Sequence, residues 1–182
     1  NSADFYAYLE TAVSAASQDL LVTFGIKPKA AHTGYGYIQR GEKNQGGFYD
    51  VKAFVEKPNL SKARAFVASG QHFINSGMFV FKAQTFLQAC MDLEPELYHC
   101  VKQAFSHAKE DLDFIRIDPA HFEKAGNVSV DYAIMERSKN IAMVPLDMVW
   151  NDIGSWSSLY EIAKKDTQGN VIKGDVCIED VE

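Results

Sequence analysis

Residues 20–26 have the sequence Leu20-Leu21-Val22-Thr23-Phe24-Gly25-Ile26. A short apolar run that follows a helix is typical of a strand buried on both faces, as strands of a parallel sheet are. The helix itself is predicted just upstream, because apolar residues recur at helical spacing from about Asp4 to Ser17. This stretch therefore indicates a layered fold in which helices pack against a sheet.

The rest of the chain repeats this alternation of strands and helices. The pattern predicts strands at 51–55, 78–81, 114–117 and 141–144, and helices at 61–69, on both sides of Pro95, at 131–137 and near 155–165. Such an order predicts an α/β domain built around a mostly parallel sheet. The turn at 166–170 is the one expected boundary, which separates residues 1–165 from residues 166–182, where new β structure is expected to start at Val171-Ile172 and Val176-Cys177-Ile178.

Composition excludes several classes of protein. A chain of 182 residues with 47% hydrophobic and 23% charged residues is an ordinary globular domain, not a disordered chain. Its net charge of −6 argues against a broad nucleic-acid interface, and no apolar stretch reaches the roughly 18 residues of a membrane span. Three widely spaced cysteines form neither a zinc pattern nor a disulfide framework, so we expect a cytoplasmic protein.

Four stretches place polar residues and glycines near the expected strand ends, where ligands bind in open α/β sheets. They are Thr33-Gly34-Tyr35-Gly36-Tyr37-Ile38, Phe54-Val55-Glu56-Lys57-Pro58, Ile74-Asn75-Ser76-Gly77-Met78-Phe79 and Trp150-Asn151-Asp152-Ile153-Gly154-Ser155-Trp156. Each also has a plainer interpretation: a tight turn, a solvated ion pair, an Asn-Ser-Gly turn and a helix cap, respectively.

The chemistry of these stretches suits the binding of a polar, anionic ligand. Glu56 offers an acceptor for hydroxyls beside Lys57, a cation for phosphate. Asn75 could hydrogen-bond a sugar, and Gly36 would let the backbone approach it. Asp152 could hold Mg²⁺, which prefers oxygen ligands and takes few protein carboxylates.

Taken together and in order, these four stretches, with Leu21–Ile26 and Val130–Glu136, resemble bacterial mannose-1-phosphate guanylyltransferase over about residues 4–180. The resemblance is greatest to the long form, which is often fused to a phosphomannose isomerase domain. It implies a Rossmann-like, GT-A-like nucleotidyltransferase with a mixed, mostly parallel sheet flanked by helices. The domain is expected to be incomplete, because the family's Gly-rich nucleotide loop and its other metal-binding Asp do not occur in this chain.

The resemblance also implies a reaction and a role for each candidate residue. GMP would pass from GTP to mannose 1-phosphate, giving GDP-mannose and pyrophosphate for polysaccharide biosynthesis. Asp152 would be the catalytic ligand of Mg²⁺ and Lys57 would neutralise the sugar phosphate. Glu56, Asn75 and Gly36 would bind the sugar. The guanine-binding residues are expected upstream, so the chain alone is expected to be inactive.

Two other interpretations stay open at this point. One is a non-catalytic module that binds a sugar phosphate, and the other is a different sugar-nucleotide pyrophosphorylase. We also expect a homo-oligomer, because a parallel sheet without its upstream strands would expose apolar edges.

Overall fold

The computed structural model describes residues 2–177 and 179, and the chain forms two compact units, 1–148 and 149–182. The elements of the first unit are α1 (Ser2–Ala16), β1 (Leu21–Ile26), β2 (Tyr37–Lys43), β3 (Tyr49–Val55), α2 (Leu60–Ser69), β4 (His72–Val80), α3 (Ala83–Leu93), α4 (Pro95–Ser106), β5 (Lys109–Asp111), β6 (Phe114–Arg116), α5 (Pro119–Phe122), η1 (Glu123–Ala125), η2 (Asp131–Met135) and β7 (Ile141–Leu146). The second unit contains α6 (Trp156–Ile162). No helix among the described residues is long and apolar enough to cross a membrane.

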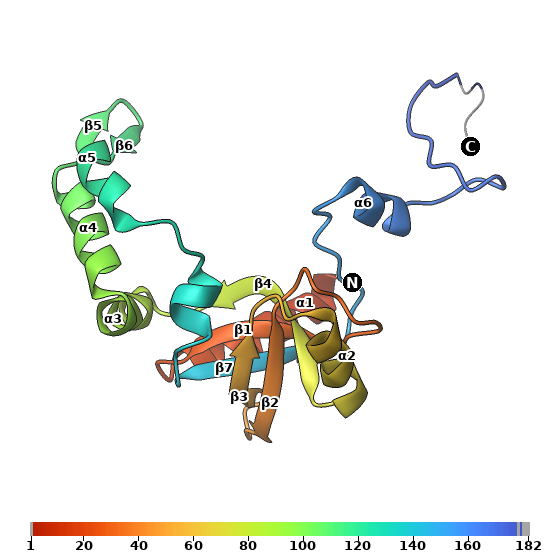
Figure 1. The fold of residues 1–182 in the computed structure, drawn as a ribbon, viewed down its shortest axis with the longest axis horizontal. Helices are drawn as coiled ribbons and strands as arrows, with labels where there is room; N and C mark the ends of the chain where they lie inside the picture. The colour runs from red at the N-terminus through yellow and green to blue at the C-terminus, as the bar shows by residue number, and fades with distance from the viewer. Residues whose placement is uncertain (1, 178, 180–182) are drawn as a thin grey trace. The chain divides into compact units, whose positions relative to one another are not determined.

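The main sheet is mixed, with the strand order β1-β4-β2-β3-β7, and its pairings close on themselves through β1 and β7 (Figure 1). Only β1 and β7 pair in parallel, whereas the other four pairings are antiparallel. The expectation of a mostly parallel sheet is therefore wrong in this respect. One cause is the short turn between β2 and β3, because such a turn forces these two strands to pair antiparallel. No strand was predicted at β2, which lies in a segment rich in glycine and polar residues.

β1 is buried on both faces, as its apolar run predicts. Val22 and Phe24 pack against α1 together with alternate residues of β7, while Leu21 faces the opposite core with Ile141 and Met143. Because successive side chains of a strand point to opposite faces, one apolar strand supplies both cores. The second core is covered by α3 and η2, so helices lie on both faces of the sheet, as expected.

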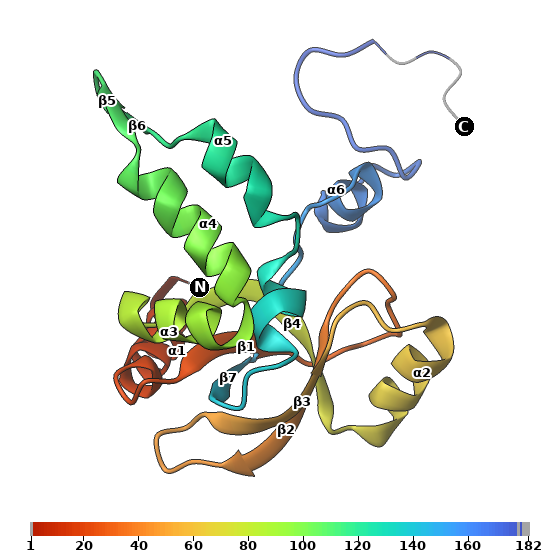
Figure 2. The same cartoon turned by 60° about the vertical axis from the view of Figure 1, so that its left-hand side comes forward.

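The boundaries of several helices follow from local sequence. Asn59 caps α2 by accepting from the Lys62 N–H, and Gly70 ends it with a left-handed φ of 65°. Pro95 begins α4, as predicted for a first-turn proline. Beyond α4, the β5–β6 hairpin and α5 form an arm that extends from the sheet (Figure 2).

The structure contradicts the expected open sheet edge and the expected β structure within residues 171–177. The closed ring of pairings leaves no open parallel edge in the main sheet among the described strands, so that reason for self-association does not hold. Residues 171–177 include no strand, while Ile178 lies outside the described residues. The predicted division at 165/166 stays a prediction, and the compact units divide at 148/149.

Candidate functional site

Gly36, Glu56 and Asn75 come together in the first unit although they lie far apart in the sequence. A Cβ atom added to Gly36 would overlap the Oε2 atom of Glu56 and lie 3.4 Å from the Cβ of Asn75. The Gly36 carbonyl also accepts a 2.8 Å hydrogen bond from the Asn75 N–H. Gly36 therefore provides the space into which the Glu56 carboxylate fits. This role differs from the predicted one, in which the Gly36 backbone approaches the sugar.

Asn75 occupies an irregular part of β4. Thr23 of β1 pairs with Phe79, but Gly25 pairs with Asn75, so extra residues of β4 bulge between these two positions. Gly77, within the bulge, has a φ of 74°, a conformation that glycine adopts without strain. The plainer interpretation of Asn-Ser-Gly as a simple turn is therefore wrong, because the segment is a bulged strand and Asn75 is buried in it.

Lys57 is the second residue after β3 and adopts an unusual backbone conformation. Its φ is 45°, in the left-handed region that non-glycine residues rarely occupy and that costs of order 1 kcal/mol. The Nζ atom lies 3.6 Å from Glu56 Oε1, and 57% of the side chain is exposed against 9% for Glu56. The pair thus combines a nearly buried acceptor with a cation that can still reach a ligand.

Two further carboxylates, Asp131 and Glu136, join this group, and no role was predicted for them. The Asn75 side-chain Nδ2 donates to Asp131 Oδ1 over 3.0 Å, and Glu136 Oε1 accepts from the Glu56 N–H over 2.6 Å. Asp131 is the first residue of η2, and Glu136 follows its last residue. This element is a single π-helical turn, closed by the hydrogen bond from the Glu136 N–H to the Asp131 carbonyl. A five-residue spacing does not place two side chains on one face of an α-helix, so the sequence pattern did not reveal the pair.

Burial and charge change the acidity of this group. Burial raises the pKa of Glu56, the negative charge of Asp131 raises it further, and Lys57 opposes both. Burial also raises the pKa of Asp131, against its backbone hydrogen bond and the hydrogen bond from Asn75. Acceptors, an amide and a mobile ammonium group suit a ligand that carries both hydroxyls and phosphate.

Asp152 belongs to the second unit, so its predicted convergence with Lys57 stays a prediction. It lies on an exposed loop where Ile153 has a φ of 51° and its N–H donates to Asn151 Oδ1. A Cβ at Gly154 would lie 2.7 Å from Asp152 Oδ2, so the glycine makes room for this carboxylate. Ser155, rather than Asp152, caps α6.

Whether this chain can hold Mg²⁺ depends on which side chains could act as its ligands. Within residues 2–177 and 179, no three histidine, cysteine or acidic side chains gather closely enough to hold a metal ion. Asp152 offers a carboxylate of the kind that Mg²⁺ prefers, and Mg²⁺ needs only one or two such protein ligands. The residue therefore fits the ion as one ligand of a shared site.

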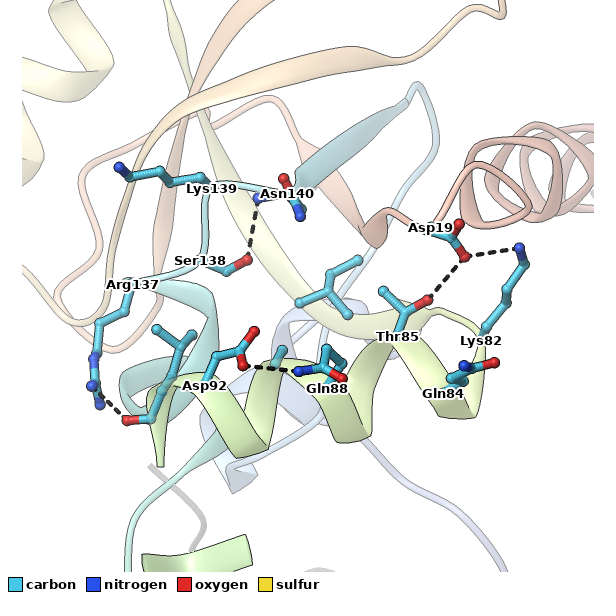
Figure 3. A pocket seen from close by; sticks show the side chains of 13 residues that line it. Asp19, Lys82, Gln84, Thr85, Gln88, Asp92, Arg137, Ser138, Lys139 and Asn140 are labelled. Atoms are coloured by element: carbon cyan, nitrogen blue, oxygen red, sulfur yellow. Dashed lines mark hydrogen bonds and ion pairs between the residues drawn. The ribbon is translucent and has the colours of Figure 1, made fainter. Parts of the chain in front are cut away.

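A cavity of about 650 Å³ lies elsewhere in the first unit and contains none of the predicted site residues. Figure 3 shows α3 along one side of it and residues 137–140 along the other. Its charged groups are largely paired with neighbours: Lys82 Nζ lies 2.9 Å from Asp19, and Gln88 donates to Asp92. This cavity is therefore separate from the group around Glu56.

Relatives of known name match most of this chain. A mannose-1-phosphate guanylyltransferase of Salmonella muenchen is 46% identical over 176 residues, which are 97% of this chain and 35% of the relative. Xanthan biosynthesis protein XanB of Xanthomonas campestris pv. campestris (strain B100) is 44% identical, over 97% of this chain and 37% of the relative. The chain thus spans about a third of the length of the curated relatives that it matches.

Solved structures have the same fold. One described as mannose-1-phosphate geranyltransferase from Thermus thermophilus superposes with a TM-score of 0.76 at 25% identity, over 88% of this chain and 45% of that one. One described as mannose-6-phosphate isomerase from Helicobacter pylori gives 0.72 at 33% identity, over 82% and 58%. The family model described as nucleotidyl transferase matches residues 1–169, and the chain therefore belongs to the nucleotidyl transferase family.

Proposed function

We propose that this chain supplies the sugar-phosphate-binding part of an enzyme that transfers GMP from GTP to mannose 1-phosphate, giving GDP-mannose and pyrophosphate. One observation carries the proposal. Gly36, Glu56, Lys57 and Asn75, each expected at a sugar phosphate, lie in one cluster of a chain that is 46% identical to a named mannose-1-phosphate guanylyltransferase.

The chain's own residues would bind and orient the sugar phosphate. Glu56 accepts hydrogen bonds from sugar hydroxyls, and Asn75 binds at the same side of the ring. Lys57 neutralises the phosphate, whose oxygen must approach the α-phosphorus of GTP although both are anionic. Positioning and charge neutralisation are the main sources of rate in such a transfer.

Mg²⁺ is the divalent ion proposed for this reaction, and Asp152 would be one of its ligands. Bound there, the ion would supply positive charge to the phosphate oxygens. A second carboxylate from outside the 182 residues would complete the site. Gly154 supports this role, since it leaves the Asp152 carboxylate the space that a larger residue would take.

A turnover assay tests the proposal. The longest natural protein that contains these residues is supplied with mannose 1-phosphate, Mg²⁺ and one nucleoside triphosphate at a time, and pyrophosphate release is measured. We expect kcat/KM to be highest with GTP, and glucose 1-phosphate to replace mannose 1-phosphate poorly. A preference for another nucleotide would favour a different sugar-nucleotide pyrophosphorylase, and binding without turnover would favour a non-catalytic module.

The proposal also covers the location of the enzyme in the cell and its assembly. Cys90, Cys100 and Cys177 are all free thiols, which supports a cytoplasmic location where thiols stay reduced. The proposal includes assembly into a homo-oligomer.

A further inference from the structure

Thr23 is a fully buried polar residue in the middle of β1, a strand that otherwise presents apolar side chains and a glycine to the cores. Strand alternation places it on the same face as Leu21, the face covered by α3 and η2. A threonine hydroxyl is costly to bury unless it has a hydrogen-bond partner. Its partner is a residue of the candidate site.

The Thr23 hydroxyl holds one end of the Asn75 amide. Its Oγ1 donates to Asn75 Oδ1 over 2.7 Å, while the carbonyl of Met78 lies further away, at 3.3 Å. The single hydroxyl hydrogen therefore favours the amide oxygen. At its other end, the amide donates from Nδ2 to Asp131 Oδ1 over 3.0 Å.

These two contacts determine which way the amide faces. If the amide were turned over, its Oδ1 would face the oxygen of Asp131, and two acceptors would be opposed in a poorly solvated place. In the observed orientation, one N–H and one lone pair of the Asn75 amide stay available to a ligand. The Asp131 carboxylate is held at the same time, beside Glu56, whose pKa its charge raises.

We infer that Thr23 is a positioning residue: its buried hydroxyl orients the Asn75 amide, and through it the Asp131 carboxylate, for binding the hydroxyls of the sugar phosphate. The inference rests on the proposed function and extends it to a residue with no contact to the substrate. It assigns to Thr23 an effect on sugar affinity rather than on the transfer step.

The test compares two substitutions at this position in the longest natural protein that contains the chain. Thr23→Val keeps the shape and removes the donor, whereas Thr23→Ser keeps the donor. We expect Thr23→Val to raise KM for mannose 1-phosphate about tenfold, the size of one lost buried hydrogen bond. KM for GTP and kcat should change by less than about twofold, and Thr23→Ser should stay near the wild type.

A matched control and a double variant separate positioning from stability. Thr85→Val also removes a threonine hydroxyl that bonds a side chain, that of Asp19, but at the separate cavity, and it should leave both KM values unchanged. In the background of Asn75→Ala, Thr23→Val should add little to KM, because Thr23 acts through that amide.

Several results would overturn the inference. One is a Thr23→Val protein with a lower melting temperature but a wild-type KM for mannose 1-phosphate, which would make the hydroxyl merely structural. Another is full additivity with Asn75→Ala. If Thr23→Val does not fold, Thr23→Ala replaces it, since alanine also lacks a side-chain donor, and a wild-type KM would count equally against the role. Absence of guanylyl transfer in the wild type would instead refute the proposed function.

Discussion

Lys57 has a backbone conformation that few lysines adopt. This conformation determines where its ammonium group lies. With a φ of 45° at the second residue after β3, its side chain stays largely exposed while its Nζ lies 3.6 Å from Glu56. Because water screens the largely exposed ammonium group, the pair contributes little to stability, at most about 1 kcal/mol. A functional use for the charge explains better why the strained residue is a lysine and not a glycine.

Replacement of Lys57 by alanine is expected to raise KM for mannose 1-phosphate by about tenfold to a hundredfold, the range for losing a charged hydrogen-bond partner. Steady-state kinetics measure it. Lys52→Ala, which removes an exposed lysine of the preceding strand β3, is the control and should behave as the wild type. Equal constants for Lys57→Ala and the control would remove the phosphate role.

Gly36 is required for space and not for backbone freedom. An alanine Cβ would displace the Glu56 carboxylate, whose long side chain can move, so the loss of folding stability should be small. Gly36→Ala is therefore expected to raise KM for mannose 1-phosphate about tenfold with little change in melting temperature. An unchanged KM in this variant would argue that the Glu56 carboxylate does not contact the sugar.

The raised pKa of Glu56 predicts that binding and stability respond to pH in opposite directions. Its folded-state pKa lies above the unfolded value, so this group destabilises the fold as pH rises through that interval, and the cost disappears below it. Sugar binding needs the ionised acceptor and should weaken as pH falls through the same interval. Melting temperature and KM for mannose 1-phosphate, measured from about pH 4 to about pH 8, report the two effects.

Glu56→Gln provides the comparison for this pH dependence. It cannot ionise, so its melting temperature should lose the wild-type slope in that interval and exceed the wild-type value at neutral pH. The ligand phosphate titrates in both proteins, and the difference between the two KM profiles therefore isolates Glu56. Parallel profiles would show that this carboxyl does not titrate as its burial implies.

At the scale of elements, the two residues that follow Asp152 in the loop before α6 determine how its carboxylate is placed. Ile153 has a φ of 51°, which is unfavourable for a β-branched residue, and Gly154 leaves space for the Asp152 carboxylate. Strain of this kind tends to persist where it positions a functional group. The loop is thus shaped around one carboxylate.

Substitution of Asp152 by alanine is expected to lower kcat about 100-fold, the scale of losing one electrostatic contribution. Gly154→Ala should lower kcat as well, by about tenfold, because the carboxylate is displaced rather than removed. Ser157→Ala, in α6, is the control. Wild-type turnover of Asp152→Ala at saturating Mg²⁺ would refute the ligand role.

At the scale of the whole molecule, the β5–β6 hairpin exposes three large apolar side chains next to one another. Leu112 is 95% exposed, and Phe114 and Ile115 are 61% and 63% exposed. The closed pairings of the main sheet remove the edge on which self-association was first expected. A two-stranded hairpin with open edges and such side chains is itself prone to association.

Self-association is therefore expected to depend on this hairpin. The double variant Leu112→Ser with Ile115→Thr should lower the mass of the isolated chain measured by light scattering at high concentration. Leu87→Ser, which removes an exposed leucine of α3, should leave that mass unchanged. A wild-type chain that is monomeric throughout would show that no homo-oligomer forms through these residues.

The sequence by itself determined the features that depend on near neighbours. The apolar run of β1 and the helix break at Pro95 were predicted correctly, because strand burial and proline geometry are local constraints. The same holds for the layered α/β class, because the alternation of strands and helices is visible in the apolar pattern along the chain.

Only the tertiary structure decided which strands pair and which distant side chains meet. Antiparallel pairing of β2, β3 and β4 depends on contacts between segments whose own composition resembles a loop or a generic strand. A buried strand places Thr23 at the site, and a π-helical turn places Asp131 and Glu136 there. A periodic pattern of apolar residues reveals neither the burial of a single hydroxyl nor a turn of five residues. Hydrogen bonds between residues more than fifty positions apart form only when the packed sheet brings them together.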